Sequence, residues 1–154
     1  MRKEAGASKK ALEYAFLLLK YRLRSENEIR LRLKKKKFSD QVIEEVAAFL
    51  KEKKFIDDSV FAKAWIESHV KRPLGLRRIE QELKLKGVGK DIISAEVNRI
   101  KKDYTEADAV KEVVEARLKR LRGLEPKLAK RRIYAYLLRR GFSPDVVYDV
   151  IGQL

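Results

Sequence analysis

The residues that could support acid–base or metal chemistry are few and poorly grouped. The sequence has one histidine, His69, and no cysteine, so it offers neither a thiolate metal site nor a disulfide. Glu80 and Glu82 are two residues apart, and side chains at that spacing on a helix point to different faces. The adjacent Asp57 and Asp58 fit a helix N-cap better than a metal site. We therefore predict no enzyme activity, no metal and no cofactor.

One glycine-rich segment, Gly87-Val88-Gly89-Lys90, invites comparison with a phosphate-binding loop. The spacing is wrong, because that loop needs four residues between its first glycine and a Gly-Lys-Ser/Thr triplet. The segment more closely suggests the Gly-x-Gly turn of helix-hairpin-helix DNA-binding modules. Two related segments of the chain carry Ser39 and Ser143 in place of the second glycine, which weakens that comparison.

Positive charge is the main chemical signal in this sequence. The 38 Lys and Arg residues outnumber the 23 Asp and Glu residues, and the formal net charge is +15. Such an excess favours a polyanionic partner, which could be nucleic acid or an acidic protein surface. A Lys- and Glu-rich surface of the thermophile type would explain the charge density but not the excess of one sign.

The cations gather in three helices. At a helix C-terminus a cation also stabilises the helix by interacting with the helix dipole, so structural and binding roles both stay open there. At a helix start the dipole disfavours a cation, which favours a binding role. Tyr134 and Tyr136 lie beside the last cluster and could stack on bases or be partly buried. The candidate binding residues are Lys34, Lys35, Lys36, Lys84, Lys86, Arg139 and Arg140 at helix ends, and Arg77, Arg78, Lys130, Arg131 and Arg132 at helix starts.

Three related segments position these clusters. When Phe38, Val88 and Phe142 are superposed, an Ile lies nine residues before each and a Leu five residues before each, and the next residue is an N-cap candidate, namely Ser39, Gly89 and Ser143. A helix C′ residue often adopts the left-handed conformation, which Gly87 can do without strain. A period of about fifty residues is typical of a tandem array of helical units.

The capping signals and the absence of period-two alternation predict an all-α protein of three tandem three-helix repeats in an elongated, curved array. Ser25-Glu26-Asn27-Glu28 has the form of a capping box that opens the second helix. The first helix is expected from about Lys9 to Arg22, after a disordered segment. We predict that segment at residues 1–8 and the repeats at 9–56, 57–104 and 105–154.

The sequence shows no membrane signal. Its longest apolar run, Ala15 to Leu19, is far too short to span a bilayer, and Glu13 and Lys20 bracket it unlike a signal peptide. We therefore expect a soluble cytoplasmic protein without a membrane partner. No dimerisation helix is evident, so we expect a monomer.

The central part of the chain resembles the RecX regulatory proteins. That family has an Asp-Asp-x-x-Phe-Ala opening, here Asp57 to Ala62, followed by Gly-x-x-Arg-Ile-x-x-Glu-Leu-x-x-Lys-Gly-Ile/Val. The segments 25–29 and 140–143 suit the first and third repeats of the family. Val60 and Lys37 depart from the pattern, where a basic residue and a glycine are common. The second motif is matched at Gly75, Arg78, Ile79, Glu82, Leu83, Lys86, Gly87 and Val88.

The resemblance implies a protein that binds the RecA–DNA filament and modulates it, most often by inhibiting RecA ATPase, filament extension and strand exchange. This would place it in DNA repair, homologous recombination and the SOS response. It also implies a basic surface that binds single-stranded DNA and, more weakly, duplex DNA. Whether the regulation is negative or positive, and whether it needs DNA contact, stays open.

Two other function classes remain as alternatives. Each repeat contains a helix-turn-helix-like pair, so the chain could be a transcription factor or a general DNA-binding protein that acts without RecA. A transcription factor is typically dimeric and concentrates its basic charge on one recognition helix, which this sequence does not show. A metal-dependent nuclease would require Mg²⁺-dependent DNA cleavage that is lost on Asp57→Asn and Asp58→Asn.

Overall fold

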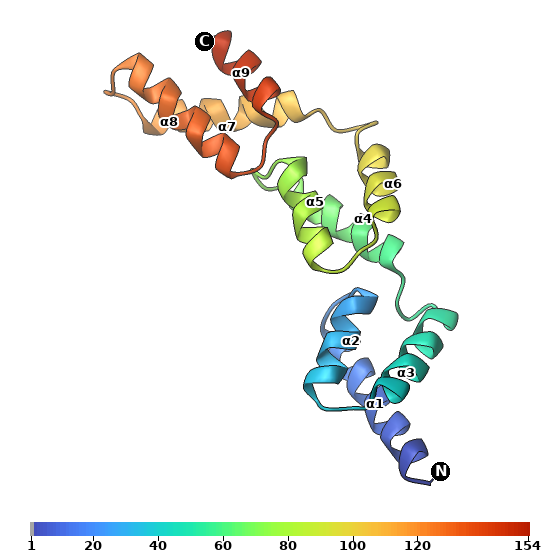
Figure 1. Ribbon diagram of the computed structural model, residues 1–154. Coiled ribbons are helices and arrows are strands. Elements are labelled where there is room, and N and C mark those ends of the chain that lie inside the picture. The colour runs from blue at the N-terminus through green and yellow to red at the C-terminus, as the bar shows by residue number, and fades with distance from the viewer. Residues whose placement is uncertain (1) are drawn as a thin grey trace. The chain divides into compact units, whose positions relative to one another are not determined.

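Figure 1 shows the computed structural model, which describes residues 2–154; within this range every regular element is a helix and no strand occurs. The predicted all-α class and the three three-helix repeats are confirmed, with α1–α3, α4–α6 and α7–α9 as the repeats. The helices are α1 (Arg2–Tyr21), α2 (Glu26–Lys35), α3 (Asp40–Glu52), α4 (Asp58–His69), α5 (Leu76–Leu85), α6 (Lys90–Ile100), α7 (Glu106–Arg120), α8 (Pro126–Arg139) and α9 (Pro144–Gly152). None of these helices combines the length and the hydropathy that a membrane span requires.

Helix α1 begins at Arg2, so the expected helix start near Lys9 was wrong. Ala7 packs at the edge of the core of repeat 1, and the Ser8 hydroxyl donates a hydrogen bond of 2.8 Å to Glu45 of α3. Residues 7 and 8 therefore pack within repeat 1, although residues 2–8 show no helical periodicity in the sequence. Met1 lies outside the described residues.

Local capping fixes several helix starts as predicted. Ser25 Oγ accepts from the Glu28 N–H at 3.2 Å, and a Glu28 oxygen accepts from the Ser25 N–H at 3.1 Å, which completes the capping box of α2. Ser39 accepts from the Val42 N–H at 3.3 Å at the start of α3. Ser143 occupies the same position before α9, but its side chain makes no cap hydrogen bond.

The turn between the second and third helices uses a left-handed residue in every repeat. Gly87 and Gly141 have φ values of 77° and 83°, and Lys37 adopts φ of 64° at the equivalent position of repeat 1. Glycine has no steric penalty in this conformation, whereas lysine does. The same turn therefore forms in repeat 1 at a conformational cost.

The apolar repeat pattern corresponds to the buried positions. The Ile and Leu residues that recur before each turn are all at most 1% exposed. Repeat 1 packs the buried faces of α1, α2 and α3 together, and repeat 3 does the same with α7, α8 and α9. The recurring buried residues are Ile29, Leu33, Ile79, Leu83, Ile133 and Leu137.

The chain divides into two compact units. The first contains Met1–Ala64 and Leu83–Ile93, and the second contains Trp65–Glu82 and Ser94–Leu154. Most of α5 and all of α7, α8 and α9 therefore belong to the second unit. Four of the candidate binding residues line grooves in that unit, namely Arg77, Arg78, Arg132 and Arg139.

Candidate nucleic-acid interface

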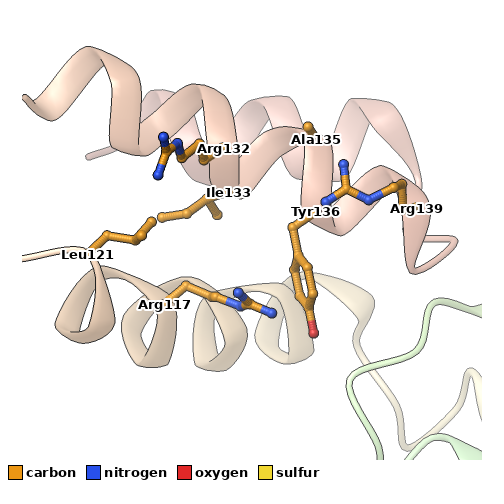
Figure 2. Close-up of a pocket in the computed structure, with 7 residues that line it drawn as sticks. All are labelled: Arg117, Leu121, Arg132, Ile133, Ala135, Tyr136 and Arg139. Carbon is orange, nitrogen blue, oxygen red and sulfur yellow. The ribbon is translucent and has the colours of Figure 1, made fainter. Parts of the chain in front are cut away.

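A groove between α7 and α8 opens on a surface rich in arginine. Its volume is about 300 Å³, and Figure 2 shows side chains of both helices converging on it. The spacing of its α8 residues, 132, 133, 135, 136 and 139, places them on one helix face. Arg117 in the last turn of α7 and Leu121 at its C-cap, four residues apart, form the opposite wall. The groove is lined by Arg117, Leu121, Arg132, Ile133, Ala135, Tyr136 and Arg139.

Tyr136 and Arg117 stack on each other across this groove. The guanidinium carbon of Arg117 lies 3.6 Å from the centroid of the Tyr136 ring, and Figure 2 shows the two side chains beside each other. This is well within the range of a cation–π contact. Arg140 lies farther from the same ring, at 5.9 Å. The stack combines a flat apolar surface with a fixed positive charge.

A second groove of about 350 Å³ lies between the start of α5 and the turn that joins α8 to α9. Arg139 lines both grooves, so the two adjoin. Among the residues that the structure describes, no carboxylate lines either groove, and Arg77, Arg132 and Arg139 form no ion pair. The second groove is lined by Arg77, Arg78, Gln81, Leu138, Arg139, Gly141, Phe142 and Pro144.

A close approach of two glycines brings α5 to this turn. The Gly75 N–H donates a hydrogen bond of 2.9 Å to the Arg140 carbonyl, and a Cβ on Gly75 would overlap the backbone of Gly141. A Cβ on Gly141 would in turn overlap Arg78. Only glycine permits backbones to approach this closely. The glycine pair therefore places Arg78 and its neighbour Arg77 beside Arg139.

Arg78 is held by a polar cluster that includes the single histidine. Its Nε donates to Glu82 at 3.1 Å, and Glu82 also accepts from the Trp65 indole N–H at 3.3 Å. The His69 ring stacks on Trp65 at 4.2 Å between centroids, and its Nδ1 lies 2.8 Å from the Trp65 carbonyl oxygen. His69 thus makes structural contacts at the end of α4.

Three predicted cations are engaged in structural contacts. Arg140 Nε donates to the Pro73 carbonyl at 2.8 Å, and Lys86 Nζ forms an ion pair of 2.9 Å with Glu28 in the first unit. Lys36 Nζ lies 5.2 Å from the centroid of an aromatic ring on α1. These contacts fasten the ends of the second helices, which is the structural alternative that the sequence left open.

The remaining predicted cations are not all gathered at the grooves. Arg131 is exposed and Lys130 is half-buried on α8, and neither lines a groove. In the first unit the side chains at the ends of α2 and α5 are exposed, and no ion pair to them occurs among residues 2–154. These first-unit residues are Lys34, Lys35 and Lys84.

The acidic pair at the start of α4 is used for capping. An Asp57 oxygen accepts from the Ser59 N–H at 2.9 Å, and an Asp58 oxygen accepts from the Glu26 N–H at 2.9 Å at the start of α2. Burial is the main cause that raises the pKa of Asp58, an effect that hydrogen bonding to the Glu26 N–H opposes. In the described part of the chain, no group of three His, Cys, Asp or Glu residues is placed to hold a metal ion.

Arg117 was missed as a candidate from the sequence. It lies in the last turn of α7, which is the first helix of repeat 3, whereas the prediction concentrated on the second helix of each repeat. The sequence feature that could have identified Arg117 is its spacing. It precedes Leu121 by one helical turn and therefore shares the helix face that meets α8. Tyr134 and Tyr136, predicted as either stacking or partly buried, are both half-buried beside the core of repeat 3.

Family models match most of the chain in three consecutive segments. The first, second and third three-helix domains of RecX match residues 11–50, 57–95 and 104–151 respectively. The chain belongs to the RecX family. Its members among curated proteins are named regulatory proteins, which is the role that the family supports.

Individual RecX proteins agree with this assignment. The chain is 40% identical to the regulatory protein RecX of Bacillus licheniformis, with 94% of this chain and 54% of that protein covered. It therefore spans about half the length of that relative. It is 30% identical to the Pasteurella multocida RecX, with 98% of this chain and 93% of that protein covered.

Crystal structures of RecX proteins share the fold. The RecX structure from Lactobacillus salivarius superposes with a TM-score of 0.85 at 22% identity, with 97% of each chain covered. A second crystal structure of a regulatory protein RecX gives a TM-score of 0.84 at 23% identity, covering 99% of this chain and 74% of the other. These likenesses concern the RecX fold alone.

Proposed function

We propose that this protein binds the RecA–DNA filament and inhibits RecA ATP hydrolysis, filament extension and strand exchange. It does so as a binding protein in the cytoplasm, without a catalytic centre or cofactor of its own. Membership of the RecX family supports a regulatory role, and the residues of the second unit supply a surface suited to a polyanionic partner. Single-stranded DNA within the filament, and duplex DNA more weakly, are the nucleic acids that this surface would meet.

The observation that carries the proposal is the arginine surface around the two adjoining grooves. Arg77, Arg132 and Arg139 come from three of the four clusters predicted in the second and third repeats, and Arg117 joins them from α7. Because no described carboxylate lines the grooves, the charge is available to a partner rather than neutralised internally. Guanidinium groups bind phosphates and carboxylates through paired hydrogen bonds.

The proposal is tested by RecA ATP hydrolysis on single-stranded DNA during titration with this protein. We expect inhibition well below one molecule per RecA monomer, and we expect it to persist when excess DNA is added. Inhibition that disappears with excess DNA would show competition for the strand, which is the behaviour of a general DNA-binding protein that acts without RecA.

A double variant identifies the surface. Arg77→Ala with Arg139→Ala removes one side chain from the second groove and the one shared by both grooves, and we expect the half-inhibitory concentration to rise at least tenfold, since hydrogen bonds to charged groups contribute about 1.5–3 kcal/mol each. The matched control is Lys119→Ala with Arg120→Ala, which removes the same charge from exposed positions on α7 outside both grooves. Equal losses in the two variants would refute a localised surface.

A further inference from the structure

We propose that the groove between α7 and α8 holds one unpaired base of a single-stranded nucleic acid. The base would stack on the guanidinium of Arg117, and Arg132 and Arg139 would bind the flanking phosphates. This inference rests on the proposed function, because it names the component of the filament that the arginine surface would contact. It adds a defined subsite to a surface otherwise described only by its charge.

The stacked pair supplies a platform for a base. The guanidinium carbon of Arg117 lies 3.6 Å from the centroid of the Tyr136 ring, and both residues line the groove. A base that enters the groove would stack on the side of the guanidinium that is turned away from this ring. Nucleobases stack on guanidinium planes as they do on aromatic rings. Contact with the Tyr136 ring restrains the Arg117 side chain, which reduces the ordering that binding would otherwise require.

The size and the lining of the groove favour one nucleotide over a duplex or an acidic protein segment. A volume of about 300 Å³ is at the small end of the range for ligand pockets, which suits one nucleotide and excludes a duplex. Leu121, Ile133 and Ala135 add apolar surface between the cations. Acidic side chains of a protein would satisfy the arginines but would leave the stacking face and this apolar surface unused.

The two phosphate-binding candidates lie on either side of the platform. Arg132 and Arg139 are seven residues apart on α8, a separation of about 10 Å along the helix axis. Figure 2 shows them apart from each other along α8, with Tyr136 between them in sequence and Arg117 on the opposite wall. A strand that passes over the groove could therefore place a phosphate at each arginine and the intervening base at Arg117.

The test compares two single-stranded probes of equal length and charge. One is an oligothymidylate, and the other is an abasic oligomer that has the same sugar–phosphate chain without bases. We expect the full chain to bind the oligothymidylate roughly tenfold more tightly, because stacking of one base contributes about that much. Equal affinity for the two probes would overturn the inference and leave a site for phosphates only.

A charge-conserving variant isolates the platform. Arg117→Lys keeps the charge and removes the planar face, so its affinity for the oligothymidylate should fall to nearly that for the abasic oligomer, which should itself be unchanged. Arg120→Lys, on the same helix and outside the groove, should change neither affinity. An equal loss of affinity for both probes in Arg117→Lys would overturn the inference, since it would show that Arg117 acts only by charge.

A second pair of variants covers the case in which Arg117→Lys disturbs the fold. Tyr136→Phe keeps the ring and should preserve the preference for bases, whereas Tyr136→Leu keeps apolar bulk without the ring and should abolish it.

Failure of this inference and failure of the proposed function are distinguishable. Filament inhibition without any preference for bases overturns only the subsite, whereas a preference for bases without filament inhibition overturns only the RecA proposal.

Discussion

The carboxylate of Glu28 offers a quantitative test of what stabilises the first unit. It accepts hydrogen bonds from Arg22 at 2.7 Å, from Lys86 at 2.9 Å and from the Ser25 N–H at 3.1 Å. The Ser25 hydroxyl, in turn, donates to the Lys86 carbonyl at 2.6 Å. One carboxylate therefore joins the start of α2 to the chain that follows α5.

The contribution of Glu28 to the stability of the fold follows from the pKa of its carboxyl group. Burial acts to raise the pKa of Glu28, but the hydrogen bonds from Arg22, Lys86 and Ser25 outweigh it and lower the pKa from 4.5 to about 2. A shift of that size corresponds to about 3 kcal/mol in favour of the charged form. Because Arg22 remains 41% exposed, solvent screening reduces the expected contribution to about 2 kcal/mol.

The variant Glu28→Gln should therefore lower the free energy of unfolding by about 2 kcal/mol at pH 7. A depressed carboxyl pKa stabilises the fold above the unfolded value and loses that effect as the pH falls through the folded value. The difference between wild type and variant should thus be full above pH 4.5 and largely lost by about pH 2. Urea denaturation followed by circular dichroism at pH 7 and pH 3 measures it.

The matched control is Glu52→Gln, at an exposed position near the end of α3, which should change stability by less than about 0.5 kcal/mol at either pH. Subtracting the two variants removes the general effect of acid on this highly charged chain. A loss below about 0.5 kcal/mol for Glu28→Gln, or a loss of the same size at pH 7 and pH 3, would refute the reasoning.

Four further substitutions at or beside the turns make three tests. Lys37→Gly should raise the free energy of unfolding by about 1 kcal/mol, because it relieves a left-handed lysine; an unchanged urea midpoint would contradict this. Gly75→Ala should cost about 1–3 kcal/mol through overlap with Gly141, measured by thermal unfolding, and a neutral effect would show that the approach relaxes. Arg140→Ala should lower the melting temperature more than Arg139→Ala does, whereas Arg139→Ala should weaken oligonucleotide binding more; the reverse order would contradict the assigned roles.

Features set by neighbouring residues were predictable from the sequence. The capping box of Ser25 and Glu28, the left-handed Gly87 and the N-cap at Asp57 each depend on a few consecutive side chains and on backbone sterics. The buried Ile and Leu positions follow from helical periodicity, which internal repetition made clearer. These signals were sufficient to identify the helices, the repeats and the fold class.

Features that depend on distant residues were not predictable in the same way. No local pattern indicates that Gly75 meets Gly141, or that Arg117 stacks on Tyr136. Likewise no local pattern indicates that Ala7 and Ser8 contact the core of repeat 1 and α3. The sequence therefore showed where basic residues cluster along the chain but could not say which of them meet at one groove.

Comparison of equivalent positions in the three repeats distinguishes the cations that make contacts within their own unit from the cations that a partner could bind. Lys36, Lys86 and Arg140 each directly precede the left-handed residue of a turn, and each contacts a ring, a carboxylate or a carbonyl of its own unit. The residue one position earlier is exposed in every repeat; it is Lys35 in repeat 1, a leucine in repeat 2 and Arg139 in repeat 3. Only Arg139 has further groove arginines around it, so repeat 3 is where a polyanion would find several cations together.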